Sequence, residues 1–313
     1  MKLVKVRFQE DLCKLFDNDF NPTTSPVTNL LRSGENVVID TSLEVHDLNL
    51  FRRNLLFSVP VFNILRDCCE VAGVPFERIH WITPVAEFTF SNKLVFNGTF
   101  EEYKMSRNGT VGFNSNIQKK FLCLNNYPKK HRRKVVDFLE STGISDDSIY
   151  SYNPREVGND KSIKIDNDFK DLDLPNNLDS LPESVWEKTG ISIITESLFS
   201  EKIIFPTEKT WKAFDKFHFP IFVSVPGFVS KIRNMGFDVF DDIINHSYDT
   251  VQDDNERLAE ILKSISAMSR MSISDISYLK KRHKERLYNN QLNLHRLIES
   301  EIQHRNNFLL SLF

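Results

Sequence analysis

The sequence predicts an α/β protein with two domains, and the repeated order of its segments is the main reason. An apolar strand begins in 36–47, a helical segment follows at 55–74, and a β-rich run follows at 78–84. The same alternation starts again after residue 120. Strand, helix and strand at this spacing form a βαβ unit with parallel strands. The 313 residues suffice for two such domains. Because the two halves repeat the same strand-helix-strand order, we expect two α/β domains that face each other across a cleft.

The second half of the chain contains its own series of predicted elements. In order, the sequence predicts a strand at 120–126, a helix within 129–143, strands at 148–153 and 189–197, and helices at 253–269 and 274–312. The polar, acidic stretch 155–184 interrupts this series, and we interpret it as an insertion or long loop because the alternation resumes after it. A segment rich in Asn, Ser and Gly, 105–120, separates the two halves.

These patterns divide the chain into three parts. We expect an N-terminal α/β domain at 1–112, a C-terminal α/β domain at 113–270 and a helical segment at 271–313. The last segment either packs back on the first domain or mediates dimerisation. In open parallel sheets, ligands bind beyond the carboxyl ends of the strands. Polar residues that follow apolar strands are therefore the candidate site residues.

Composition narrows the classes of protein. The net charge of −3 argues against a protein that binds a polyanion over its whole surface, but it allows a local basic groove. No apolar run approaches the roughly 20 residues of a membrane helix, and residues 1–12 lack the apolar core of a signal peptide. The four cysteines include no C-x-x-C pair, so we interpret them as reduced core thiols. We expect a cytoplasmic protein without membrane contact.

Cofactor and metal signatures are weak. The ten glycines form neither a G-x-G-x-x-G nor a P-loop pattern. D-x-D triplets occur in polar stretches rather than at the ends of apolar strands, at Asp17/Asp19, Asp166/Asp168 and Asp171/Asp173. We therefore expect no bound cofactor and no metal site.

The stretch "FPTEKTWKAF" contains the most informative candidate. Thr207 is a plausible N-cap, with Glu208 and Lys209 in the first helical turn. A glutamate is favourable near the positive end of the helix dipole, whereas a lysine opposes it. Lys209 makes sense there if an anion such as a diphosphate binds, because free N–H groups make the helix start an anion site. The alternative is a solvated first turn with a glutamate cap.

A second basic segment follows the strand that ends near Asn125. In "KKHRRK", at 129–134, five cations open a helix, where the dipole again disfavours them. They either extend into solvent or converge on phosphate. Arg132 and Arg133 are the better phosphate candidates because arginine suits bidentate contacts.

The first domain offers carboxylates and a histidine beyond its strands. Asp40, Glu44 and His46 follow the apolar run of 36–47, and Glu87 lies after the next strand. A carboxylate or histidine facing an anion site could act as the general base on an acceptor hydroxyl. The alternative is a set of ordinary surface side chains.

The second half also resembles a known family. "LNNYPKKHRRK" at 124–134, "TEKTWK" at 207–212, "MGFDVF" at 235–240 and "SYD" at 247–249 before a helix with Arg257 occur in order. Together they resemble the donor domain of GT-B glycosyltransferases, both the fucosyltransferase-like kind and phage-encoded relatives. The likeness spans 120–262; the N-terminal half matches only in general layout, and the acidic stretch 155–184 departs from the pattern.

The resemblance implies a fold, a reaction and residue roles. It implies two facing Rossmann-like domains and sugar transfer from a nucleotide-diphosphate sugar, in the host bacterial cytoplasm if the protein is phage-encoded. Lys209 would contact the diphosphate, Glu208 the ribose, and Glu44 would be the catalytic base. The remaining donor-side positions would be Asn125, Arg132, Arg133, Glu196 and Thr207. Second-tier positions are Asp40, His46 and Glu87. Tyr248, Asp249 and Arg257 belong to the same second tier, with a structural role as the alternative to one in the site.

The resemblance leaves several acceptors open. Phage enzymes of this kind often modify hydroxymethylated pyrimidines in DNA, and others modify surface glycans. The basic segments 129–134 and 280–286 could hold a DNA backbone; alternatively, the first serves the donor and the second is a solvated helix face. A non-catalytic nucleotide- or nucleic-acid-binding module of the same fold is the alternative outside enzymes.

Overall fold

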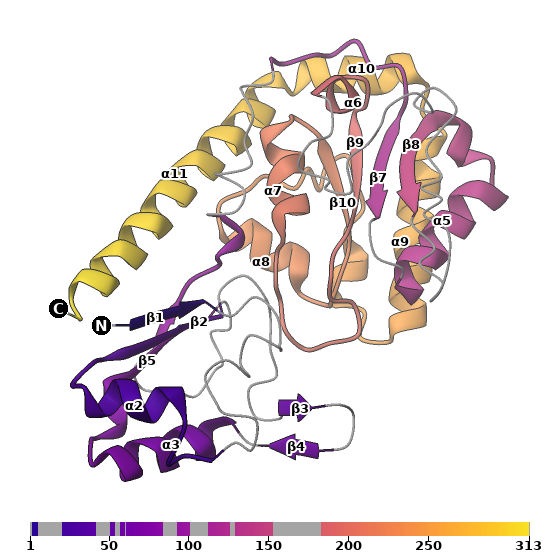
Figure 1. Cartoon of the computed structure of the whole chain (residues 1–313). Coiled ribbons are helices and arrows are strands. Elements are labelled where there is room, and N and C mark those ends of the chain that lie inside the picture. Colours follow the sequence, from indigo (N-terminus) through magenta and orange to yellow (C-terminus); the bar gives the residue numbers. More distant parts are fainter. Residues whose placement is uncertain are drawn as a thin grey trace. The chain divides into compact units, whose positions relative to one another are not determined.

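The computed structural model describes most of the second half of the chain and separate parts of the first (Figure 1). The described residues are 2–5, 21–41, 51–53, 57–59, 61–83, 93–100, 112–125, 129–152 and 183–312. The chain forms two compact units, one of Met1–Glu102 with Glu299–Phe313 and one of Tyr103–Ile298. Each unit contains a parallel sheet and helices, so the prediction of an α/β fold with parallel strands is confirmed.

Unit 1 is built on a parallel four-stranded sheet in the order β1-β2-β5-β6. Its strands are β1 (Lys2–Lys5), β2 (Val37–Asp40), β5 (Ile79–Thr83) and β6 (Lys93–Val95). Its helices are α2 (Pro26–Arg32) and α3 (Val61–Ala72), with a 3-10 turn η2 (Phe76–Arg78). An antiparallel pair, β3 (Phe51–Arg53) and β4 (Phe57–Val59), precedes α3. Helix α3 is therefore shorter than the helix predicted at 55–74, because residues 57–59 of that range form strand β4.

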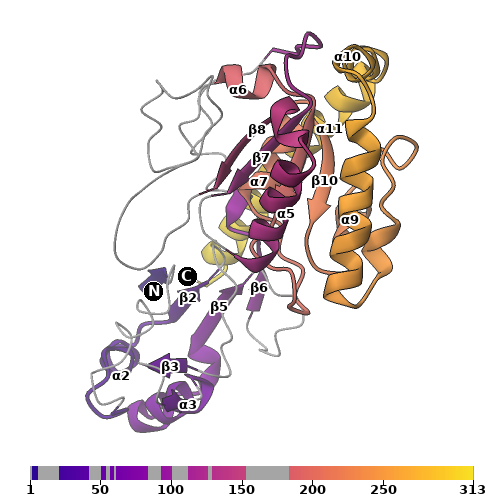
Figure 2. The ribbon, with the colours of Figure 1, turned by 90° about the vertical axis from the view of Figure 1, so that its right-hand side faces the viewer.

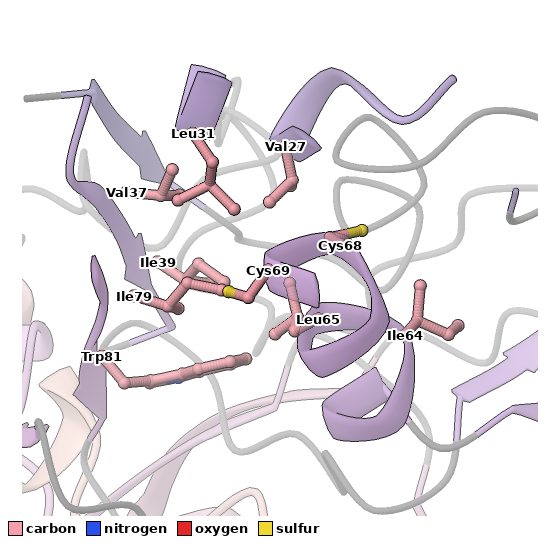
Figure 3. Packing of buried hydrophobic residues seen from close by; sticks show 10 residues of the cluster. All are labelled: Val27, Leu31, Val37, Ile39, Ile64, Leu65, Cys68, Cys69, Ile79 and Trp81. Atoms are coloured by element: carbon pink, nitrogen blue, oxygen red, sulfur yellow. The ribbon is translucent and has the colours of Figure 1, made fainter. Parts of the chain in front are cut away.

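The core of unit 1 lies on both faces of this sheet. On one face, Ile39, Ile79 and Trp81 from the strands pack against Leu65 and Cys69 of α3 (Figure 3). The opposite face carries Val38, Ile82, Leu94 and Phe96, against which the end of helix α11 (Lys284–Leu310) and Leu312 pack. The apolar strands are buried on two sides, as continuous rather than alternating apolar runs indicate.

Unit 2 contains a second parallel sheet, in the order β10-β9-β7-β8. Its strands are β7 (Phe121–Asn125), β8 (Ser148–Tyr152), β9 (Ile191–Thr195) and β10 (Phe219–Val223). Its helices are α5 (Lys130–Ser141), α6 (Glu183–Glu187), α7 (Glu208–Asp215), α8 (Phe228–Asn234), α9 (Asp254–Ser269), α10 (Ile273–Arg282) and the first part of α11, with 3-10 turns η3 (Ile144–Asp147) and η6 (Ser247–Thr250).

The strand order of unit 2 reverses between β7 and β9. The crossover through α5 leads from β7 to β8, whereas the crossover through α7 leads from β9 to β10 in the opposite direction. Because parallel crossovers are right-handed, these two helices cover opposite faces. Helix α9 lies beside α5 (Figure 2). The carboxyl ends of β7 and β9 thus form a topological switch point, the usual place for a ligand in such sheets.

The helix ends follow the local sequence. Gly143, with φ of 74°, follows α5 in the left-handed conformation that glycine tolerates best. Ser272 and Asp275 form a reciprocal capping box at the start of α10. The predicted helical region 274–312 is interrupted at His283, whose backbone leaves helical geometry and separates α10 from α11. Among the described residues, the helices are too short or too polar to cross a membrane.

Candidate functional site

Glu196 organises the start of α7. It follows β9, is fully buried, and accepts hydrogen bonds at Oε1 from the Thr207 backbone N–H (3.0 Å) and the Thr210 hydroxyl (2.6 Å). Its Oε2 accepts from the Thr207 hydroxyl at 2.6 Å. Thr207 occupies the predicted N-cap position, but its hydroxyl binds Glu196 instead of a helical N–H. The carboxylate therefore fixes the helix start and does not belong to the pocket lining.

Glu208 and Lys209 form an ion pair on the first turn of α7. The Lys209 Nζ lies 2.9 Å from Glu208 Oε1, and the two side chains are only 16% and 22% exposed. Burial raises the pKa of Glu208, but Lys209 and then Lys212 outweigh burial and lower that pKa to about 2. Lys209 thus has an anionic neighbour within the chain. Lys209 therefore does not need a ligand to balance its charge at the helix start, although the ion pair remains partly exposed.

A small, partly open pocket adjoins this ion pair. Its lining is provided by Leu122, Leu124, Trp186, Ser192, Ile193, Ile194, Thr195, Glu208, Lys209 and Lys212. The lining residues of β7, β9 and α6 are apolar except for Ser192 and Thr195, and those of α7 are charged. Lys209 and Lys212 are three residues apart and share a face of the helix. Such a lining would suit a ligand that is apolar or aromatic at one end and anionic at the other.

The residues at the switch point are largely occupied by contacts within the chain. Asn125 is buried and accepts at Oδ1 from the Thr195 hydroxyl. The buried Arg132 donates through Nη2 to the carbonyl oxygens of Thr195 (3.1 Å) and Glu196 (3.3 Å). Arg132 therefore holds the chain that leaves β9. Arg133 is exposed and pairs with Asp137 at 2.7 Å instead.

The "SYD" element and Arg257 hold the C-terminal part of unit 2 together. Tyr248 is buried, and its hydroxyl accepts from the backbone N–H of Phe222 in β10. The Asp249 carboxylate accepts from the N–H groups of Val229 and Ser230 at the start of α8. The buried guanidinium of Arg257 donates to four backbone carbonyls, those of Phe199, Ser224, Val251 and Gln252. These contacts fit the structural role that the sequence left open for them.

Of the four candidate residues in unit 1, the structure describes only Asp40. Asp40 is buried and pairs with Arg305 of α11 at 3.0 Å. Its carboxylate is therefore engaged within unit 1. Glu44, His46 and Glu87 lie outside the described residues, as do all three D-x-D triplets. In the part of the chain that the structure describes, no group of three or more His, Cys, Asp or Glu side chains could hold a metal ion.

The structure adds pocket residues that the sequence did not indicate. Lys212 follows Lys209 at helical spacing, so a face-by-face inspection of α7 would have found it. Trp186 and Ser192 give no such signal, because each becomes a pocket residue only through its place beside α7.

Comparison with known proteins gives no further guide to the site. The chain matches no protein-family model, no curated protein and no solved structure.

Proposed function

We propose that the chain is a glycosyltransferase of the GT-B kind that uses a nucleotide-diphosphate sugar. The observation that carries the proposal is the pocket of unit 2, which combines an apolar wall with two lysines at a helix start. A nucleoside diphosphate has the same division, since its base is aromatic and its phosphates are anionic. Helix N–H groups and cations are the groups that bind phosphate in proteins.

The phosphates would replace Glu208 as the partner of Lys209. The ion pair at 2.9 Å holds the lysine at the pocket until a stronger anion arrives. The freed Glu208 carboxylate would then accept from a ribose hydroxyl. Lys212, on the same face, would hold the second phosphate.

The same groups would assist the chemical step. The bond between the anomeric carbon and the diphosphate oxygen breaks, and negative charge develops on the leaving phosphate. Lysines already in place stabilise that charge where it forms, in the role that other enzymes give to a metal ion. The acceptor oxygen bonds to the anomeric carbon, and its proton passes to a carboxylate, for which Glu44 remains our candidate.

We favour a hydroxymethylated pyrimidine in phage DNA as the acceptor. The support is the exposed basic surface at the start of α5, formed by Lys129, Lys130, Arg133 and Lys134. Such a surface suits a phosphate backbone. A surface glycan is the second candidate, and a nucleotide-binding module without activity is the third.

The proposal is tested by transfer to a defined acceptor. The protein is incubated with a panel of nucleotide-sugars and either hydroxymethylcytosine DNA or glycan acceptors, and products are analysed by mass spectrometry. We expect a hexose or pentose mass on the DNA nucleoside, abolished by Lys209→Ala and retained by Lys231→Ala, an exposed control in α8. Sugar on the glycan alone would replace the DNA acceptor, and no transfer with any donor would refute the enzyme assignment.

A further inference from the structure

His218 is a buried histidine of unit 2 that forms hydrogen bonds with two residues of the pocket lining. It is fully buried and follows α7 immediately before β10. Its Nδ1 lies 2.8 Å from the Ser192 hydroxyl, and its Nε2 lies 2.8 Å from the Trp186 carbonyl oxygen. Both partners line the pocket. The histidine itself does not, so it acts on the pocket only through them.

A Schellman motif directs His218 toward these partners. The His218 N–H donates to the Ala213 carbonyl at 3.0 Å, and the Phe217 N–H approaches the Phe214 carbonyl at 3.4 Å. Phe217 fills the left-handed position of this motif, with φ of 59°, where glycine is usual. A bulky residue in that conformation is strained and persists only when its surroundings hold it. Aromatic contact with Tyr288, at 4.8 Å between ring centroids, provides such a hold.

The hydrogen bonds determine the tautomer of the ring. The Trp186 carbonyl can only accept, so Nε2 must carry the proton and donate it. Nδ1 is then the acceptor, and the Ser192 hydroxyl must donate to it. Burial, followed by the charge of Lys280, lowers the pKa of His218 well below its ordinary value, so the ring stays neutral. The Ser192 oxygen consequently offers a ligand only lone pairs, which accept from an N–H or O–H donor.

We propose that His218 is a positioning residue for the nucleobase, holding Trp186 and Ser192 as the base-binding wall of the pocket. This inference rests on the proposed function, because it assigns the nucleotide's two ends within the same pocket. The hydrogen-bond partners of the His218 ring are Thr189, Ser192 and Trp186, whereas the charged end is formed by Lys209 and Lys212. Loss of the histidine should therefore weaken binding of the base and leave binding of the phosphates unchanged.

Two probes separate these ends. UDP and GDP carry a base and a diphosphate, whereas inorganic pyrophosphate carries the diphosphate alone. Calorimetric titration of the full chain gives Kd for each. We expect His218→Phe to raise the nucleotide Kd about tenfold, with the pyrophosphate Kd within about twofold of wild type. His218→Gln, whose amide can restore a donor near Nε2, should recover part of the loss.

Matched variants keep the test decisive. Ser192→Ala removes one partner without a large change of volume, so it reports on the wall even if His218→Phe does not fold. His246→Phe is the control, because His246 is also buried in unit 2 and bonds the Pro220 carbonyl, but it does not line or contact the pocket residues. We expect Ser192→Ala to show the same selective loss and His246→Phe to show none.

The outcomes distinguish this inference from the proposed function. If wild type binds UDP or GDP and both His218→Phe and Ser192→Ala keep the wild-type Kd, the positioning role is refuted while the nucleotide site stands. If the variants lose nucleotide and pyrophosphate equally, His218 has only a general structural role and the inference is also refuted. If wild type binds neither nucleotide nor pyrophosphate, both the site and the inference fail.

Discussion

Replacement of Lys280 by methionine tests whether a buried lysine of unit 2 loses its proton near pH 7. Lys280 is 1% exposed, and its Nζ donates to the Thr189 carbonyl at 3.2 Å. Burial lowers its pKa from 10.5 to about 7. The folded state therefore releases its proton near pH 7, whereas the unfolded chain keeps it until about pH 10.4.

The sign and size of the pH dependence follow from this difference. Below pH 7 both states hold the proton, and the cost of burying the charge is constant. Between pH 7 and about 10.4 the unfolded state binds more protons, so the free energy of unfolding rises with pH. The slope approaches about 1.4 kcal/mol per pH unit. The free energy of unfolding therefore increases by about 2 kcal/mol between pH 7 and 9 because of this lysine. Lys280→Met removes this dependence.

Urea unfolding at several pH values measures this pH dependence of the free energy of unfolding. The free energy of unfolding of wild type minus that of Lys280→Met should increase by about 2 kcal/mol from pH 7 to 9. Groups common to both proteins cancel in this difference. Lys281→Met, one residue further along α10 and exposed, is the control and should show no such trend. A constant difference for Lys280→Met would refute the assignment, because it would mean that the lysine titrates like an exposed one.

Substitutions at three further residues test the contacts that shape unit 2, each by urea unfolding. Glu196→Ala should lower the free energy of unfolding by about 3–5 kcal/mol, because it strands buried donors; Glu196→Gln should cost less than half as much, and equal losses would contradict this account. Gly190→Ala should lower the free energy of unfolding by about 1–3 kcal/mol, since its Cβ would lie 2.7 Å from Cγ2 of Ile276 in α10. An unchanged free energy of unfolding would show that α10 can move aside without cost. Arg257→Lys should cost about 3 kcal/mol, because an ammonium cannot reach four carbonyls at once; a loss below about 0.5 kcal/mol would show those bonds to be unimportant.

The order of strands and helices was readable because it depends on local patterns. Apolar runs of strand length and the helical spacing of 130–141 predict β7, α5 and β8 closely. The break at His283 was missed, since the sequence there continues without proline or glycine. The short strands β1, β3, β4 and β6 were also missed, because three or four residues give too little pattern.

The candidate site was only partly readable, because it depends on contacts between distant segments. The strand-end rule indicates Thr207, Glu208 and Lys209, and the last two line a pocket. The basic run at 129–134 was interpreted as solvated or phosphate-binding, yet Arg132 binds backbone carbonyls. Its position three residues before the buried Val135 was the available signal for an inward side chain.

The wall of the pocket could not have been found from the sequence. Trp186 and His218 are 32 residues apart, and Ser192 meets His218 only because α6, β9 and the turn after α7 converge. A single sequence has no periodicity that links such positions. The pocket therefore had to come from the structure.

Binding of a nucleoside diphosphate to unit 2 is the claim on which the account depends most, and calorimetry tests it directly. UDP and GDP are titrated into wild type, Lys209→Ala and the exposed control Lys231→Ala at two salt concentrations. We predict that wild type and the control bind at least one of the two nucleotides at one per chain, that Lys209→Ala weakens this binding about tenfold or more, and that salt weakens it further. Absence of binding to wild type, or an unchanged Kd in Lys209→Ala, would contradict the account.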